Sequence, residues 1–336
     1  MNIAIVGATG NVGRKIIEVL EKKNFPISEL YLIASSKSSG KKISFKGKEL
    51  IVIDLEKFDF SKVTIAFFAA GSSIAEKWAY KAAEKTIVID NSKFFRKDPD
   101  IPLVVPEVNS KELVHVKNKN IIANANCSVI PLVVALKPLH DLYIVKRIVV
   151  STYQSVSGAG KAPMDELLTQ TKEYFDKKNL QSKHFTKQIA FNVIPHIDSF
   201  LENGNTKEEQ KTIDEVKKIL DKKIKITSTC VRIPVLVSHC ISANVEFDKK
   251  YNLEEIKNVL STSPGCKVVD EHKDGGYITP VEAENKYETF ISRIRKDDSQ
   301  SNSINLWVAS DNLLKGAALN AVEIAESLIK KNLHER

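Results

Sequence analysis

Cys127 is the residue whose type and setting most suggest covalent chemistry. It stands in the stretch "NANCSVIPLVV", with asparagines before it and an apolar run after it. The segment "CSVIPLVVALKPLH" predicts a helix that begins at the cysteine; Pro131 is tolerated in a first turn, where N–H groups are unpaired. A thiol at a helix N-terminus has a lowered pKa, so more of it is nucleophilic thiolate. The alternative is a buried, inert cysteine, which is what most free cysteines are.

His239 is a candidate for proton transfer. It ends the stretch "RIPVLVSH", seven positions after Arg232, in a segment that predicts strand, bend and strand. Unperturbed histidine titrates near neutrality, so it can both donate and accept a proton. A lone histidine in an apolar strand is more often structural, however, and the residue type leaves both interpretations open.

The first residues of the chain predict a dinucleotide-binding loop. In "IAIVGATGNVG" a strand over residues 3–6 is followed by Gly7, Gly10 and Gly13 and then by a helix through residues 15–22. Glycines at this spacing allow a tight turn and close approach of the backbone to a pyrophosphate, and the helix N-terminus offers N–H groups to the anion. The placement after a strand, at the start of an alternating α/β segment, makes this motif specific.

The loop after the second predicted strand favours NADP over NAD. About twenty residues beyond the glycines an NAD site carries a carboxylate for the ribose 2′-hydroxyl. Here the strand "ELYLIA" leads instead into "SSKSSGKK", where Ser35, Ser36 and Lys37 could donate to a 2′-phosphate. A solvated polar loop is the alternative. A later strand ends in the small residues of "FFAAGSS", at the position where an open α/β sheet receives its ligand.

The elements that must position these residues follow two different patterns in the two parts of the chain. The first third alternates apolar strands with helical segments, which predicts an α/β domain with a Rossmann-like, doubly wound parallel sheet. Beyond Cys127, longer strands accompany lysine- and glutamate-rich helices and predict an α+β domain with a more antiparallel sheet. Small residues at helical spacing in the last segment suggest that it packs back onto the first domain. We therefore expect a dinucleotide-binding domain over residues 1–126, completed by a C-terminal helix over 312–336, and a catalytic and dimerisation domain over 127–311.

Bulk composition narrows the function classes. A chain of 336 residues is long enough for two domains. The net charge of +8 arises from lysines scattered among acidic residues, and no aromatic-basic motif indicates a nucleic-acid partner. No apolar run has the length of a membrane helix, and the N-terminus does not resemble a signal peptide, so a cytoplasmic protein is expected. The four cysteines form no CxxC pair, so neither a disulfide framework nor a metal site is expected.

Taken together, the motifs resemble a known family. The glycine loop, "NANCS", "YQSVSGAG", "RIPVLVSH" and "DNLLKGAA" occur in the order found in aspartate-semialdehyde dehydrogenases, and the resemblance runs from Met1 to about Ile329. It implies a nucleotide-binding domain, an α+β domain that carries a homodimer interface, and NADP as cofactor. The implied reaction is the reversible reductive dephosphorylation of L-4-aspartyl phosphate to L-aspartate 4-semialdehyde and phosphate. The products feed the synthesis of lysine and diaminopimelate, threonine and methionine.

The resemblance also implies roles for individual residues. Cys127 corresponds to the nucleophile that forms an acyl-thioester, His239 to the acid/base residue, and Gln154 to the residue that orients the substrate. Arg232 corresponds to the clamp on the substrate α-carboxylate, for which a planar two-pronged donor is suited. Glu208 would meet the substrate ammonium, although without the resemblance it reads as half of an exposed ion pair.

Further residues follow from the same resemblance. The transferred phosphate would bind to Arg96, Lys211 and Asn126. The residues expected at the cofactor are Gly7, Thr9, Gly10, Asn11, Val12, Gly13, Ser35, Ser36, Lys37, Ala70, Gly71, Ser157, Gly158 and Asn312.

Three alternatives remain open at this point. N-acetyl-glutamyl-phosphate reductase shares the fold and thioester chemistry, but "NCS" followed by "QSVSGAG" argues against it. Glyceraldehyde-phosphate dehydrogenase has a different glycine loop and active-site motif. A non-catalytic NADP-binding redox sensor with Cys127 as its switch would need no carboxylate clamp.

The sequence departs from the family pattern at two places. Lys37 stands where many relatives carry arginine, and the lysine-rich segment 171–188 matches no motif of the family to which a role is assigned.

Overall fold

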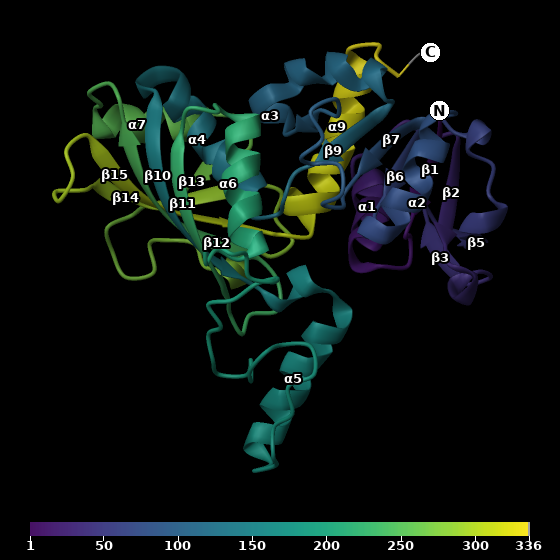
Figure 1. Cartoon of the computed structure of the whole chain (residues 1–336), viewed down its shortest axis with the longest axis horizontal. Helices are drawn as coiled ribbons and strands as arrows, with labels where there is room; N and C mark the ends of the chain where they lie inside the picture. The colour runs from purple at the N-terminus through teal and green to yellow at the C-terminus, as the bar shows by residue number, and fades with distance from the viewer. Residues whose placement is uncertain (335–336) are drawn as a thin grey trace. The chain divides into compact units, whose positions relative to one another are not determined.

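The computed structural model describes residues 1–334 and divides into two compact units (Figure 1). The first unit contains Met1–Asn126 and the C-terminal segment from Ala317; the second contains Cys127–Gly316. The C-terminal segment thus joins the first unit five residues later than the expected residue 312. The physical reason is that the Asn312 side chain bonds to groups of the second unit. Residues 335–336 of the expected C-terminal helix lie outside the described residues.

The first unit is built on a parallel sheet, as the alternating apolar strands predict. Within the described residues its seven strands lie in the order β5-β2-β1-β6-β7-β9-β8, and each neighbouring pair is parallel. The central strands are almost wholly buried because helices cover the sheet. The strands are β1 (Asn2–Val6), β2 (Glu29–Ala34), β5 (Ile53–Asp54), β6 (Ile65–Phe68), β7 (Ile87–Asp90), β8 (Leu103–Val104) and β9 (Ile121–Asn124). A small antiparallel hairpin joins β3 (Lys42–Phe45) to β4 (Lys48–Ile51).

Four α-helices of the described chain belong to this unit. They are α1 (Asn11–Lys22), α2 (Ser72–Ala83), the single turn α3 (Pro106–Asn109) and α9 (Leu319–Lys330). The C-terminal helix α9 packs beside α1 and against β7. Its buried face carries Ala321, Ile324 and Leu328 at helical spacing, as the sequence predicts. The doubly wound dinucleotide-binding fold expected for this part of the chain is confirmed.

The second unit has a mixed sheet, in agreement with the α+β expectation. Within the described residues its strand order is β11-β10-β12-β15-β14-β13; β10–β11 and β13–β14 are parallel and the other pairs antiparallel. The strands are β10 (Val145–Gln154), β11 (Lys225–Arg232), β12 (His239–Phe247), β13 (Cys266–Val268), β14 (Thr289–Lys296) and β15 (Ser303–Ser310). The helices are α4 (Val129–Tyr143), α5 (Lys161–Phe175), α6 (Lys207–Ile219), α7 (Leu253–Thr262) and α8 (Pro280–Ala283).

Helix α4 lies in the core of this unit and follows the cysteine of interest. It is apolar on nearly all sides, which is typical of a buried helix, and it packs with α6 and α7 against the sheet. Its first residue is Val129 and Ser128 is its N-cap, so the helix begins two residues later than expected. Cys127 therefore sits in the turn immediately before the helix.

The lysine-rich segment 171–188 forms the end of α5 and a strap fastened back onto that helix. The Glu166 carboxylate, on α5, accepts hydrogen bonds from the main-chain N–H groups of Lys183 and His184 at 3.2 and 2.7 Å. The Gln170 side chain accepts from the N–H groups at 189 and 190. Figure 1 shows α5 projecting away from the sheet of its own unit. The segment therefore has an ordered structural role in supporting a projecting arm.

Candidate functional site

The second unit brings together Cys127 and His239, which lie 112 residues apart in the sequence. The Sγ atom of Cys127 is 3.4 Å from Nε2 of His239. The cysteine is half-buried in the turn before α4, and the histidine is the first residue of β12 and fully buried. The candidate nucleophile and the candidate acid/base residue are thus within contact of each other, as thiol catalysis requires.

The environment of His239 differs from the near-neutral titration expected from its residue type. Burial, followed by the positive charge of Arg232, lowers the pKa of His239 to about 3, against the opposing effects of the Ser238 main chain and Glu208. Desolvation disfavours a charged ring, and a neighbouring cation does so further. His239 is therefore a neutral imidazole near pH 7 rather than a group poised between two charge states.

Gln154 and Arg232 lie next to each other at the carboxyl ends of β10 and β11. The two residues are direct partners in the parallel register of these strands, and both are almost fully buried. The Arg232 guanidinium donates through Nη1 to the Ser155 carbonyl at 2.6 Å. The Gln154 amide donates to Oγ1 of Thr152 at 3.2 Å and to Oε1 of Glu208 at 3.3 Å.

Helix α6 presents Glu208 and Lys211 from its first turns. A capping box between Thr206 and Glu209 fixes the start of the helix. The Lys211 ammonium donates to Oε2 of Glu208 at 2.6 Å and to Oδ2 of Asp198 at 3.1 Å. Burial acts to lower the pKa of Lys211, but the two carboxylates raise it above its usual value. The expected phosphate contact at Lys211 would have to compete with these carboxylates.

Ser157, Gly158 and Asn312, expected at the cofactor, lie around His239. A Cβ atom on Gly158 would come within 3.2 Å of the His239 ring and 3.3 Å of the Arg232 guanidinium. The Asn312 carboxamide is buried and bonded to the hydroxyl of Ser157. The structure thus uses these three residues to shape the surroundings of the histidine.

Sequence reasoning missed two residues of this neighbourhood. The Ser155 main-chain N–H and hydroxyl contact Nδ1 of His239 at 3.1 and 3.0 Å. Gly316 lies in a π-helical turn, Leu314–Ala318, and a Cβ there would fall 3.0 Å from Cβ of Cys127. The glycine in "LLKGAA" was visible as a possible close approach, whereas nothing in the type of Ser155 marked it.

The first unit contains a cavity of about 370 Å³ at the carboxyl ends of β1, β2 and β6. Expected cofactor residues Gly7, Thr9, Gly10, Ser35 and Ala70 line it, together with Val6, Ala34, Leu55, Ala69 and Ile74. The carboxyl edge of an open α/β sheet is where such folds bind ligands. Of the remaining expected residues, Asn11, Val12 and Gly13 form the first turn of α1, Gly71 is the N-cap of α2, and Ser36 and Lys37 lie exposed beyond β2.

The glycine loop has the geometry that a dinucleotide requires. Gly7 has a φ of 90°, and a Cβ there would come within 2.6 Å of the Ala69 carbonyl oxygen. A Cβ on Gly13 would fall 2.2 Å from the Gly7 carbonyl oxygen, so only glycine allows α1 to pack this closely on the loop. The α1 N-cap is Gly10, which has no side chain to cap the first N–H groups of the helix. These residues fit a bound nicotinamide dinucleotide with its pyrophosphate at the helix N-terminus.

One carboxylate near the expected 2′-phosphate loop comes from a distant part of the sequence. Asp54, at the end of β5, is the parallel register partner of Ala34 at the end of β2. Its Oδ1 accepts a hydrogen bond from the Glu56 N–H at 3.2 Å and caps a short 3₁₀ turn. The sequence window after β2 contains no carboxylate, but the fold brings one to the adjacent strand end.

Arg96 and Asn126, expected at the phosphate, both belong to the first unit and are buried. The Arg96 guanidinium donates to the main-chain carbonyls of Asn124 and Asn91 at 2.9 and 3.1 Å. Burial raises the pKa of nearby Asp90 to about 6, although Ser92 and Arg96 act to lower it. The two hydrogen bonds to main-chain carbonyls fix the Arg96 guanidinium against the carboxyl ends of β7 and β9.

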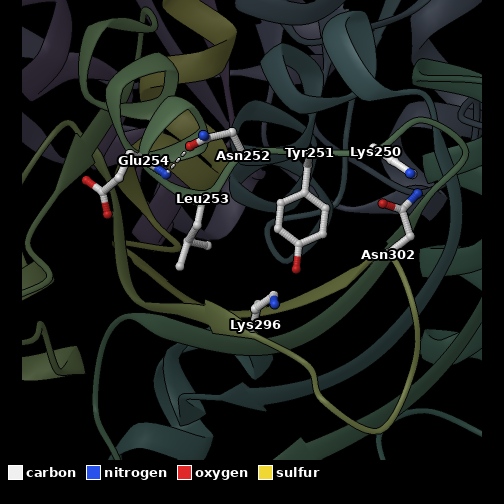
Figure 2. Close-up of a pocket in the computed structure, with 7 residues that line it drawn as sticks. All are labelled: Lys250, Tyr251, Asn252, Leu253, Glu254, Lys296 and Asn302. Carbon is white, nitrogen blue, oxygen red and sulfur yellow. Dashed lines mark hydrogen bonds between the residues drawn. The ribbon is translucent and has the colours of Figure 1, made fainter.

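Another hollow, of about 430 Å³, lies beside the start of α7 and contains none of the expected site residues (Figure 2). Its polar groups serve the fold. The Asn252 side chain caps α7, and the Tyr251 hydroxyl donates to the Ser303 carbonyl at 2.8 Å. Across residues 1–334 no cluster of three or more His, Cys, Asp or Glu side chains could hold a metal ion, and no helix is long and apolar enough to cross a membrane.

Comparison with known proteins gives consistent matches over nearly the whole chain. Residues 2–116 match the family model described as semialdehyde dehydrogenase, NAD binding domain, and residues 136–315 match semialdehyde dehydrogenase, dimerisation domain. The aspartate-semialdehyde dehydrogenase of Aquifex aeolicus is 50% identical over 98% of both chains. The crystal structure of aspartate semialdehyde dehydrogenase II complexed with ASA from Vibrio cholerae is 46% identical over 98% of both chains, with a TM-score of 0.96. The Candida albicans enzyme with NADP is 25% identical, covers 99% of both chains and has a TM-score of 0.75.

Proposed function

Because the chain belongs to the aspartate-semialdehyde dehydrogenase family, we propose that it interconverts L-4-aspartyl phosphate and L-aspartate 4-semialdehyde with NADP. In the reductive direction the acyl phosphate is converted to the aldehyde and inorganic phosphate. The products would supply lysine and diaminopimelate, threonine and methionine synthesis. The observation that carries the proposal is the 3.4 Å contact between Cys127 and His239, with a buried guanidinium beside them.

Cys127 would act as the nucleophile. Its thiolate attacks the acyl carbon and an electron pair moves onto the carbonyl oxygen. When the tetrahedral adduct collapses, the bond to phosphate breaks, and the acyl group remains on Sγ as a thioester. A thioester suits both directions, because it can be reduced or displaced by phosphate. His239, whose Nε2 lies 3.4 Å from Sγ, would be the acid/base residue at the substrate oxygen.

Arg232 and Glu208 would recognise the amino-acid end of the substrate. A buried guanidinium with remaining donors can hold the α-carboxylate by two parallel hydrogen bonds. The Glu208 carboxylate has the charge to meet the ammonium, and Gln154, which donates to it at 3.3 Å, would orient the acyl group. Arg96, Lys211 and Asn126 are the proposed phosphate ligands, with Lys211 exchanging a carboxylate partner for the phosphate.

The cavity of the first unit would hold the cofactor. NADP, when bound, accepts or supplies the hydride. The Gly7–Gly13 loop would hold its pyrophosphate, and Ser35, Ser36 and Lys37 its 2′-phosphate. The structure of a relative with NADP supports this choice. Ser157, Gly158 and Asn312 are the residues proposed for the nicotinamide end.

We further propose that the protein is a homodimer. The dimerisation-domain match covers the second unit, whose exposed surface carries the clustered rings of Tyr174, Phe175 and Phe191. Phe175 is 72% and Phe191 58% exposed, and apolar side chains gathered in this way mark interaction surfaces. Light scattering should detect a dimer that Phe175→Ser weakens and Ile51→Ser, an exposed residue of the first unit, does not. A monomeric parent protein would contradict this.

The reaction can be tested by following NADPH formation with aspartate semialdehyde and phosphate. N-acetyl-glutamate semialdehyde is the matched control substrate, because it separates this activity from N-acetyl-glutamyl-phosphate reductase. We expect phosphate-dependent turnover of the free amino acid and little of the acetylated one. Preference for the acetylated substrate would overturn the assignment, and absence of turnover with either would favour the redox-sensor alternative.

A further inference from the structure

The Lys211 ammonium lies between two carboxylates that come from different segments of the second unit. It donates to Oε2 of Glu208 at 2.6 Å, one helical turn earlier on α6, and to Oδ2 of Asp198 at 3.1 Å, in the loop before α6. The side chains of Lys211, Asp198 and Glu208 are only 15, 25 and 8% exposed, so water and salt screen these charges less than those of a surface ion pair. One positive and two negative charges thus meet at a residue proposed to bind phosphate.

The segment that carries Asp198 is tied to two elements. The main chains of Ile194 and Arg232, the last residue of β11, exchange two hydrogen bonds of 2.9 and 2.8 Å. The Lys207 N–H, at the start of α6, donates to the Ser199 carbonyl at 2.9 Å. Asp198 is therefore held between the two elements that carry the proposed ligands of the substrate carboxylate and of phosphate.

The local backbone accounts for the shape of Asp198 but not for its charge. Its φ is 69°, a conformation that Asp and Asn tolerate better than most residues with side chains. Its Oδ1 accepts a hydrogen bond from the Ser199 N–H at 2.9 Å. An asparagine would suit the same backbone and accept the same hydrogen bond, so the carboxylate charge calls for a second explanation.

We propose that Asp198 is a specificity-determining residue of the phosphate site, whose carboxylate pairs with Lys211 in the resting protein and competes with phosphate for it. The inference rests on the proposed function, in which Lys211 is a phosphate ligand. Like charges close together repel, so the Asp198 carboxylate opposes the arrival of the anion beside Lys211. Phosphate is a product of the reductive reaction, and a competing carboxylate keeps it from being retained.

The competition is between anions for a cation that stays charged. Burial acts to lower the pKa of Lys211, but Glu208 and Asp198 raise it above its usual value. Lys211 is therefore an ammonium throughout the neutral pH range. Removing the Asp198 charge leaves this ammonium paired with Glu208 alone and makes it a stronger attractor of phosphate.

Calorimetric titration of the full-length protein with inorganic phosphate tests the proposal. For Asp198→Asn we expect the Kd for phosphate to fall at least about threefold, within the range that a partly exposed ion pair contributes. Asp198→Gly, which also suits a positive φ, should shift the Kd in the same direction. Glu202→Gln removes the same charge from an exposed position in the same loop and should leave the Kd unchanged. Unchanged or weaker phosphate binding by both Asp198 variants would overturn the proposal.

A double-mutant cycle tests whether the effect acts through Lys211. Lys211→Ala should weaken phosphate binding, and Asp198→Asn should then have little further effect. An equal gain from Asp198→Asn in the presence and absence of the Lys211 side chain would show that the carboxylate does not compete for this ammonium, and the proposal would be wrong.

Kinetics separates the phosphate site from a general effect on the fold. In the phosphorylating direction Asp198→Asn should lower the KM for phosphate at least about threefold and leave the KM values for aspartate semialdehyde and NADP unchanged. A uniform change of all three would point to a structural role and count against the proposal. Because the titration needs no aspartate semialdehyde, tighter phosphate binding by Asp198→Asn in a protein that does not turn over this substrate would count against the proposed function alone.

Discussion

Arg232 is held in a way that lysine cannot reproduce. Its Nη1 donates to the Ser155 carbonyl, and its planar group lies beside the His239 ring, so the fork that serves the fold is also the proposed clamp on the substrate carboxylate. Lysine offers a point charge on a flexible stem, which would let a bound carboxylate swing. The reacting carbon must lie within about 3–3.5 Å of the nucleophile, so a swinging substrate loses rate as well as affinity.

We therefore predict that Arg232→Lys raises KM and lowers kcat by at least about tenfold, or about 1.4 kcal/mol. Steady-state kinetics checks this, with Arg147→Lys on the exposed side of β10 as the control. NADPH affinity should be unchanged, because Arg232 is not among the residues proposed to hold the cofactor. Near-normal kcat and KM in Arg232→Lys would remove this residue from the substrate site.

Lys37 decides the proposed preference for NADP. It lies exposed beyond β2, next to Ser35 and Ser36, while Asp54 already places one carboxylate at the neighbouring strand end. Lys37→Glu would replace attraction for the 2′-phosphate by repulsion. We expect the ratio of kcat/KM for NADP to that for NAD to fall at least about tenfold, equivalent to about 1.4 kcal/mol. Lys41→Glu, an exposed residue outside the set expected at the cofactor, should leave the ratio unchanged. Equal use of both cofactors by the unmodified protein would contradict the preference.

At the scale of elements, Gly10 and Gly13, at the junction of β1 and α1, have different structural roles. A methyl group on Gly13 would collide with the main chain of Gly7 at 2.2 Å, and main-chain atoms cannot give way easily. Gly10 has a φ of −79°, and its added Cβ would meet only the Gly7 carbonyl oxygen at 3.4 Å. The contact between Gly13 and Gly7 therefore sets the packing of α1 on the loop, whereas Gly10 leaves the surface open for the cofactor.

This difference predicts a split between stability and binding. Gly13→Ala should lower the free energy of unfolding by about 1–3 kcal/mol through overpacking. Gly10→Ala should leave stability nearly unchanged and weaken NADPH binding. Denaturant unfolding and a fluorescence titration measure the two effects separately. Equal stability of the two variants would show that the close contact at Gly13 relaxes without cost.

Element boundaries near the site follow the sequence less well than the elements themselves. The apolar runs that became β1, β2, β6 and β7 were predictable because a buried parallel strand must be apolar throughout. The π-turn at Leu314–Ala318 was not, because its residues have ordinary helical periodicity and its shape depends on the close approach of Gly316 to Cys127. The contact of Ser155 with His239 also depends on tertiary structure, which no spacing in the sequence encodes.

For the whole molecule, burial of Asp90 makes stability depend on pH. Its folded pKa is raised from 3.8 to about 6, mainly by burial, so the folded state binds the proton more tightly than the unfolded chain. Stability contributed by this group is present at low pH and is lost as pH rises through about 4 to 6. The loss is at most about 3 kcal/mol, since one pKa unit corresponds to about 1.4 kcal/mol.

We predict that Asp90→Asn stabilises the protein near neutral pH, because the amide removes the buried charge and can still accept from Ser92. The gain should vanish below about pH 4, where the aspartic acid is protonated in both states. Urea unfolding at several pH values checks this, with the exposed Asp100→Asn as control. A variant less stable than the parent at neutral pH would mean that the Asp90 charge is needed beside Arg96.

The two-domain architecture and the candidate site residues could be proposed from the sequence. The surroundings of these residues could not. The glycine loop and the Cys127 motif consist of residues close together in the sequence, so they can be recognised without knowledge of tertiary contacts. The protonation state of His239 could not be predicted, because it depends on burial and on Arg232 across the sheet. The carboxylate of Asp54 beside Ala34 was likewise invisible, because parallel register joins residues twenty positions apart in the chain.

The thioester on Cys127 is the central claim, and intact-protein mass spectrometry tests it most directly. The protein is incubated with aspartate semialdehyde and NADP⁺ in the absence of phosphate, and then phosphate is added. We predict one acyl group on Cys127, released by phosphate, and none on Cys127→Ala, which still folds and binds NADPH. Cys266→Ala, which lacks a half-buried thiol elsewhere in the second unit, should behave like the parent. An acyl group on Cys230 or Cys266, or turnover by Cys127→Ala, would contradict the account.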